Sequence, residues 1–403
     1  MSVRHLELSR RDLLSAASGL VMVTALPSAT ISAQTPKATV AGVPKSPAGT
    51  RSTTAAADLP VQAEPGQGTV LVTGGTGYVG GWCIVELLRR CYAVRTTIRN
   101  LAKEGAVRAA VGSAVDAGDR LSFFAADLTR DDGWDAALAD CDYVLHVASP
   151  LGGGNPDDKE SLVAPARDGA LRVLRAATKA GVKRVVMTSA ATVATPPMSG
   201  PDSVSDETVW FDPHEDVDPY RHSKRLAERA AFDFMKSYRG ATTLATVLPG
   251  AIFGPILTKD SLGSTEVIRR LLQGRVPANP HFGLQIVDVR DLADLHIRAM
   301  ISPHAAGERF LGVGEFMWMA EISRTLRSQL GVAASQVPTR NMPDFLFRLF
   351  ALFDPSLQAM TPRLGKMQRH TAAKAQRLLG WQSRSAVTTL VDCAESLIAR
   401  QAI

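Results

Sequence analysis

Cysteine is scarce in this sequence and follows no pattern that a disulfide framework or a zinc site requires. Cys83, Cys91, Cys141 and Cys393 form no Cys-x-x-Cys pair and no cluster with histidines at metal-ligand spacing. We therefore expect isolated core or surface thiols and no metal site. Runs of lysine and arginine with interleaved aromatic residues are also missing, so the net charge of +6 indicates a scattered basic surface and no nucleic-acid partner.

Long apolar runs are absent after residue 33, which argues against a stable membrane insertion of the mature chain, and no internal repeat indicates an array. The remaining composition is that of a globular protein: 403 residues, of which 45% are hydrophobic and 21% charged. Such a chain can bury a substantial core. Its positive charge leaves anionic small molecules, such as a phosphorylated cofactor, as candidate partners.

Residues 1–33 are predicted to be an export signal. Arg10 and Arg11 precede an apolar run that ends at Leu26, and small residues at 31–33 offer a cleavage site, a pattern that resembles a twin-arginine signal peptide. The predicted location is the periplasm, and the alternative is the cytoplasm with an uncleaved tail.

Residues 34–67 are rich in Pro, Ala, Thr, Ser and Gly and are predicted to be a disordered linker, because they hold too few large apolar residues to offset the entropy of ordering.

The stretch from Thr69 to Gly81 reads as a strand, a tight turn and a helix. β-favouring residues at 70–73 run into Gly74-x-x-Gly77-x-x-Gly80, and a helical pattern follows. Glycines at this spacing supply the turn and let backbone N–H groups at the helix N-terminus approach a pyrophosphate without a Cβ in the way. In this setting the pattern favours dinucleotide binding over an ordinary structural turn.

From Val70 onwards, short apolar strands alternate with helix-period segments. This alternation predicts a doubly wound α/β fold with a parallel sheet, whose ligand lies beyond the carboxyl ends of the strands. The predicted strands are 70–73, 93–98, 121–126, 143–148, 185–188 and 245–248.

The end of the second predicted strand favours NADP over NAD. An NAD site usually places an acid there to bond the ribose 2′-hydroxyl, but this chain has Arg99 and no acid before Glu104. An arginine at this place favours a 2′-phosphate. Lys103 is a weaker second candidate, equally well explained as a solvated lysine at a helix start.

Tyr220 and Lys224 stand four residues apart in a helical sequence, on one face and one turn apart. A tyrosine with its ordinary pKa of about 10 is a poor proton-transfer partner at neutral pH, and a neighbouring positive charge favours the phenolate. Joined to the glycine turn upstream, the pair predicts proton transfer to or from a reacting oxygen.

In the order of its motifs, the chain resembles an extended short-chain dehydrogenase/reductase, and within that superfamily the dihydroflavonol reductase and aldehyde/ketone reductase branch. The resemblance implies an NADP-binding Rossmann domain at 68–250 and a mainly substrate-binding region at 251–403, with some return to the Rossmann sheet. Beside the Tyr220/Lys224 pair it rests on Thr73-Gly74-Gly75-Thr76-Gly77-Tyr78-Val79-Gly80, Ala126-Asp127-Leu128-Thr129, His146-Val147-Ala148-Ser149-Pro150, Leu248-Pro249-Gly250, Phe253-Gly254-Pro255, Val289-Arg290-Asp291-Leu292-Ala293 and Leu379-Gly380-Trp381.

The resemblance also implies cofactor contacts and a reaction. The implied reaction is the NADPH-dependent interconversion of an aldehyde or ketone with its alcohol, with Tyr220 as proton donor assisted by Lys224; a nucleotide-sugar epimerase or dehydratase is the alternative. The implied cofactor residues are Gly74, Thr76, Gly77, Tyr78, Val79, Gly80, Arg99, Lys103, Asp127, Leu128, Val147, Ala148, Ser149, Tyr220, Lys224 and Pro249.

One position departs from the family pattern. Relatives usually carry a serine or threonine after the fifth strand that bonds the substrate oxygen, and this chain has Ala190 there. Loss of one such donor typically costs about 2.7 to 4 kcal/mol of transition-state stabilisation. Either Ser189 or Thr192 takes over, which we prefer, or the protein binds NADP with impaired catalysis.

Further residues have less specific expectations. His222 and His296 are interpreted as structural, and His146 as structural or as a wall of the cofactor cleft. Phe345 to Phe353 is an apolar helical stretch, by default core and alternatively a pocket cap or a contact in a homodimer. The segments expected to shape the substrate pocket are 151–161, 198–219 (with Glu207, Trp210 and Phe211) and 254–280.

Overall fold

The computed structural model describes residues 68–149, 160–196, 202–210 and 219–403. The predicted signal peptide and linker, residues 1–67, lie outside the described residues, as do Phe211 and most of the predicted pocket segments 151–161 and 198–219.

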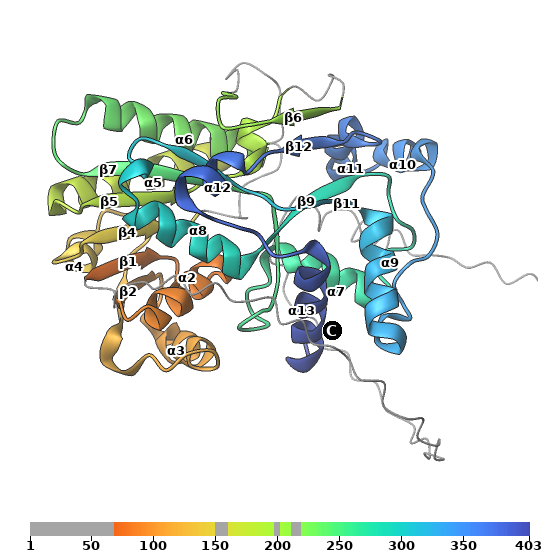
Figure 1. Cartoon of the computed structure of the whole chain (residues 1–403), viewed down its shortest axis with the longest axis horizontal. Coiled ribbons are helices and arrows are strands. Elements are labelled where there is room, and N and C mark those ends of the chain that lie inside the picture. The colour runs from red at the N-terminus through yellow and green to blue at the C-terminus, as the bar shows by residue number, and fades with distance from the viewer. Residues whose placement is uncertain (1–67, 150–159, 197–201, 211–218) are drawn as a thin grey trace, which may run out of the picture. The chain divides into compact units, whose positions relative to one another are not determined.

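Seven parallel strands form the main sheet, in the order β10-β7-β5-β4-β1-β2-β3 (Figure 1). The chain runs outward from β1 to β3 and then returns to β4 on the other side of β1, so the strand order reverses between β1 and β4. Doubly wound sheets bind their ligands at such a switch point. The predicted fold and its six strands are confirmed. The strands are β1 Thr69–Thr73, β2 Ala93–Ile98, β3 Leu121–Ala125, β4 Tyr143–His146, β5 Arg184–Thr188, β7 Thr243–Pro249 and β10 Arg309–Gly312.

Helices cover both faces of this sheet. Successive side chains of a strand point to opposite faces, so Leu71 packs with α4, α5 and α6, whereas Val70 and Val72 pack with α2, α3 and α8. The central strand is therefore apolar on both sides, as buried parallel strands are. The helices are α2 Tyr78–Arg89, α3 Glu104–Gly112, α4 Trp134–Leu138, α5 Glu160–Ala180, α6 Pro219–Ser237 and α8 Val289–Ile301.

The second half of the chain contributes β10 to the edge of the main sheet and builds two small sheets of its own, β11-β9-β8 and β12-β6. The strands are β6 Ser203–Ser205, β8 Ala251–Phe253, β9 Gly283–Asp288, β11 Phe316–Trp318 and β12 Gln368–His370; the helices are α7 Glu266–Leu272, α9 Met319–Leu330, α10 Asp344–Ala351, α11 Pro355–Met360, α12 Ala373–Leu379 and α13 Ala386–Ala399. Single turns of 3₁₀ helix are η1 Leu101–Lys103, η2 Gly118–Arg120, η3 Ala191–Ala194, η4 Gly263–Thr265, η5 Pro303–Ala305, η6 Gly331–Ala334 and η7 Thr361–Arg363.

A hydrogen bond and an ion pair join α8 to the last segment of the chain. The indole Nε1 of Trp381, which is fully buried, donates to the carbonyl oxygen of Asp291 at 2.7 Å. Arg384 forms an ion pair with the Asp291 carboxylate at 2.6 Å. Two motifs that are far apart in sequence, at 289–293 and 379–381, are thus parts of one structural contact.

The apolar stretch Phe345 to Phe353 is a correction to the sequence-based expectation. Only Phe347 and Ala351 in it have buried side chains at 4% exposure each, while Leu352 and Phe353 are 74% and 79% exposed. The default prediction of a core helix is therefore wrong for most of this segment. Among the described residues, no helix combines the length and the apolar character that a bilayer crossing needs.

Candidate active site

The glycine turn between β1 and α2 is held tightly against β2. Gly74 has a φ of +76°, and the N–H groups of Gly74 and Gly75 both donate to the carbonyl oxygen of Thr97 at 3.1 Å. A Cβ on Gly80 would lie 2.5 Å from the Gly74 carbonyl oxygen, so this position excludes any side chain. The turn therefore has a bare backbone at the carboxyl end of β1.

The N-terminus of α2 is open to an anion. Gly77 is its N-cap, no side chain caps the helix, and its first turn holds no acid. The N–H groups there lack intrahelical partners and carry the positive end of the helix dipole. Thr76 is exposed, whereas the buried Tyr78 donates its hydroxyl to the Gly254 carbonyl oxygen at 2.9 Å. Tyr78 can therefore offer a cofactor only its backbone.

Thr73 fixes the end of β4 beside this turn, and sequence reasoning missed it. Its Oγ1 accepts from the N–H groups of Val147 and Ala148, both at 3.0 Å, and lies 3.0 Å from Nδ1 of His146. Because two donors already point at this oxygen, its own proton goes to His146 Nδ1. Burial, with a smaller effect of Lys224, lowers the pKa of His146 to about 3, so the imidazole is neutral. Val147, Ala148 and the half-buried Ser149 thus line the same edge as Gly74.

Two cations lie at the carboxyl end of β2. Arg99 and Lys103 are exposed and form no ion pair with an acid in the described part of the chain. Arg99 lies near Asp127, whose pKa is lowered first by the hydrogen bond from the Thr129 N–H and less by the charge of Arg99. Leu128 follows and faces Gly169 of α5, where a Cβ would approach to 2.9 Å. The ends of β2 and β3 therefore bring Arg99 and the Asp127-Leu128 pair together.

Lys224 is buried on α6 and reaches the carboxyl end of β5. Its Nζ donates to the Thr188 carbonyl oxygen at 3.3 Å, and burial lowers its pKa to about 8. It therefore stays mostly charged at pH 7. Tyr220 is half-buried one turn earlier on the same helix. Helix geometry brings the two side chains onto one face.

One turn beyond Lys224, Glu228 anchors α6 to the sheet. Its fully buried carboxylate accepts from Ser189 Oγ at 2.9 Å and Thr246 Oγ1 at 2.7 Å, and pairs with Arg309 at 3.1 Å. The hydroxyl proton of Ser189 is thus donated to the Glu228 carboxylate. This bond disfavours Ser189 as the replacement for Ala190, and its role at the substrate oxygen stays a prediction.

Thr192 offers the other hydroxyl. Its Oγ1 is buried and has no hydrogen-bond partner among the described residues. Arg221 holds the surrounding turn η3 by donating to the carbonyl oxygens of Thr192 at 2.9 Å and Thr195 at 2.7 Å. An orphaned buried hydroxyl is rare in folded proteins, because leaving it unbonded is costly. Pro249, buried at the end of β7, closes the same edge of the sheet.

The remaining sequence candidates have structural roles. His296 is fully buried between Thr188 Oγ1 at 2.8 Å and the Leu292 carbonyl oxygen at 2.8 Å. Glu207 accepts from the Leu311 N–H at 2.9 Å, and the ring of Trp210 packs against the Arg309 guanidinium at 3.9 Å. Glu207 and Trp210 therefore brace β10, and their expected role as pocket walls stays a prediction.

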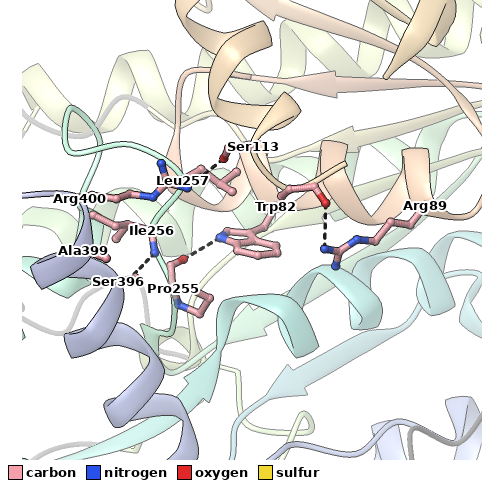
Figure 2. A pocket seen from close by; sticks show the side chains of 10 residues that line it. Trp82, Arg89, Ser113, Pro255, Ile256, Leu257, Ser396, Ala399 and Arg400 are labelled. Atoms are coloured by element: carbon pink, nitrogen blue, oxygen red, sulfur yellow. Dashed lines mark hydrogen bonds between the residues drawn. The ribbon is translucent and has the colours of Figure 1, made fainter. Parts of the chain in front are cut away.

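Two hollows lie apart from these residues. The first is a cavity of about 650 Å³ that residues of α2 and of the C-terminal helix α13 help to line. In it the Trp82 indole donates to the Pro255 carbonyl oxygen and Arg400 reaches Ser113 (Figure 2). The second, of about 1090 Å³, is lined partly by Gln285 and His370. Neither is lined by the glycine turn or by Lys224.

Comparison with known proteins decides the family. The model of the NAD dependent epimerase/dehydratase family matches residues 70–311. The chain belongs to this family. Cinnamoyl-CoA reductase 1 of Oryza sativa subsp. japonica is 36% identical over 262 residues, which cover 64% of this chain and 75% of that protein. Ketoreductase azaE of Aspergillus niger is 32% identical over 351 residues, which cover 82% and 97%. The predicted membership of the extended reductases is confirmed.

Solved structures of this family share the fold of the chain. Yeast methylglyoxal/isovaleraldehyde reductase Gre2, complexed with NADPH, superposes with a TM-score of 0.68 at 24% identity, covering 83% of this chain and all of that one. Gre2 of Candida albicans, also complexed with NADPH, gives 0.68 at 25% identity over 82% and 99%.

Proposed function

We propose that this family member is an NADP(H)-dependent reductase that interconverts an aldehyde or ketone with its alcohol. The observation that carries the proposal is the buried Lys224, held at the carboxyl end of β5 one turn from Tyr220 and on the edge of the sheet that carries the glycine turn. Similar proteins include a cinnamoyl-CoA reductase and a ketoreductase.

The residues present fit the cofactor. A bare glycine turn and an uncapped helix N-terminus suit a pyrophosphate. Arg99 suits a 2′-phosphate because a guanidinium binds phosphate through paired hydrogen bonds. Asp127 and Leu128 would border the adenine, and Val147 to Ser149 and Pro249 would line the cleft towards the nicotinamide.

The protein supplies proton transfer and orientation. When bound, the reduced nicotinamide supplies the hydride. Tyr220 gives its phenolic proton to the carbonyl oxygen, and the Lys224 ammonium stabilises the phenolate that remains. The Thr192 hydroxyl donates a second hydrogen bond to the same oxygen, taking the part that Ala190 cannot.

The test compares cofactor oxidation by wild type and Tyr220→Phe over a panel of aldehydes and ketones. Loss of the general acid should lower kcat by about 10²- to 10⁴-fold, while NADPH binding, measured by fluorescence titration, should weaken by at most about tenfold, because one hydrogen bond at most is lost. Equal rates in the two proteins would remove Tyr220 from the mechanism. Tight NADPH binding without turnover in wild type would favour a binding protein, and turnover of nucleotide sugars would favour an epimerase.

We also propose that the chain is exported through residues 1–33. The support is Arg10-Arg11 ahead of an apolar run. A pathway that carries folded proteins would let the enzyme leave with its cofactor loaded. Cell fractionation of wild type and Arg10→Lys/Arg11→Lys tests this: periplasmic enzyme that becomes cytoplasmic is expected, and a cytoplasmic location in both contradicts export.

A further inference from the structure

Helix α10, at the upper right of Figure 1, and the turn after it expose an unusual apolar surface. Five large apolar side chains within nine residues are exposed: Phe345 69%, Leu349 48%, Phe350 36%, Leu352 74% and Phe353 79%. Elsewhere in the described residues, exposed apolar side chains are scattered, as is normal for a soluble protein. A contiguous group of this size marks a binding surface. We name it the α10 surface.

The helix is more apolar outward than inward. Its inner side is made by Phe347 and Ala351, which are buried. Phe345, Leu349 and Leu352 recur at helical spacing on the outer side, together with Arg348. A helix whose only task was to cover the core would carry polar residues there. The outer residues are therefore explained by what they contact outside the fold.

The charge around the α10 surface is positive. Arg340 and Arg348 are exposed and pair with no acid in the described part of the chain. Of the two acids between residues 340 and 369, Asp354 is buried, whereas the Asp344 side chain is 42% exposed and lies 3.3 Å from the His281 ring. The same segment holds more basic residues than acids: Arg340, Arg348, Arg363, Lys366 and Arg369. Aromatic and leucine side chains edged by arginines are the composition of helices that lie in the interface of an anionic bilayer.

We propose that the α10 surface docks this protein on an anionic lipid bilayer, with Phe345, Leu352 and Phe353 among the acyl chains and Arg340 and Arg348 among the phosphates. This proposal does not depend on the proposed reaction. A second copy of the chain fits the surface less well. Arg348 lies among the outward apolar side chains, so a two-fold interface centred there would bring two Arg348 side chains together. The acid one turn earlier, Asp344, faces His281 instead.

The test is co-sedimentation of the full chain with vesicles of phosphatidylcholine, with or without phosphatidylglycerol, at low and high salt. Binding is expected only with phosphatidylglycerol at low salt. Leu352→Glu/Phe353→Glu should weaken it at least about tenfold, and Arg340→Gln/Arg348→Gln by about tenfold or more. Val332→Glu is the matched control: Val332 is 89% exposed but lies outside the α10 surface, so this variant should bind like wild type.

The full chain also carries the apolar run before Leu26, which could bind vesicles by itself. The proposal is therefore judged by the difference in vesicle binding between wild type and the variants. Equal vesicle binding by wild type and Leu352→Glu/Phe353→Glu overturns the proposal, and so does absence of binding in wild type. A dimer in light scattering that Leu352→Glu/Phe353→Glu converts to monomer, without vesicle binding, assigns the surface to a second copy. Thermal melting and NADPH binding unchanged in the variants show that the fold is intact.

Discussion

At the scale of single residues, Thr192 is the proposed replacement for the hydroxyl that Ala190 lacks. Its buried hydroxyl has no partner among the described residues, while the hydroxyl of Ser189 is bonded to Glu228. Thr192→Val should therefore lower kcat by about 10²- to 10³-fold, because one donor to the reacting oxygen is lost. Steady-state kinetics measures this. Thr192→Ser should keep most of the rate, and Ala190→Ser should restore part of it in the Thr192→Val background. An unchanged kcat in Thr192→Val would remove this hydroxyl from the reaction.

Arg99 is the residue to which we assign the proposed preference for NADPH. An exposed guanidinium without an acid partner at the end of β2 is free to bind a 2′-phosphate. Arg99→Ala should raise KM for NADPH by roughly 10- to 100-fold, since hydrogen bonds to a charged group are lost, and leave KM for NADH nearly unchanged. Lys103→Ala is the companion variant, with a smaller effect expected from a more flexible point charge. Comparable use of both cofactors, unaffected by Arg99→Ala, would refute the preference.

At the scale of elements, Glu228 in the third turn of α6 holds this helix against the main sheet. Glu228 is fully buried and pairs with Arg309, so removal of one charge leaves the other buried and uncompensated. Glu228→Gln should lower the free energy of unfolding by about 3 to 5 kcal/mol. Glu228→Gln combined with Arg309→Met should recover much of this, because neither charge remains. Urea unfolding of the two single variants and the double variant gives the interaction free energy between Glu228 and Arg309. A cost of Glu228→Gln no larger than that of an exposed carboxylate would contradict the anchoring role.

The elements also show what a sequence can and cannot reveal. The glycine turn and the Tyr220/Lys224 spacing are local patterns, and helix and strand periodicity sufficed for the order of strands and helices. Thr73 with His146, and Trp381 with Asp291, meet across 73 and 90 residues, and no spacing rule connects them. The hydrogen bond from Ser189 to Glu228 spans 39 residues and could not be predicted from the sequence for the same reason. Phe345 to Phe353 was misjudged because apolar content indicates burial only where another element covers the face.

At the scale of the whole molecule, the buried His146 and His296 and the half-buried His370 link the fold to pH. Burial is the main cause that lowers the pKa of His146 to about 3 and of His296 and His370 to about 4. An unfolded histidine titrates near 6.5. Between pH 6.5 and about 4 the unfolded chain therefore binds protons that the folded chain does not, so stability falls as the pH falls through this window.

This linkage predicts a loss of about 2 kcal/mol for each of the three histidines between pH 7 and pH 5. Urea unfolding at the two pH values measures it. His296→Gln destabilises the fold at both, since it disturbs the bonds to Thr188 and Leu292, but it should reduce the difference between the two pH values by about a third. His304→Gln, at an exposed position, is the matched control. If His296→Gln keeps the full pH difference of wild type, the acid sensitivity comes from other groups, and the neutral buried state of His296 is wrong.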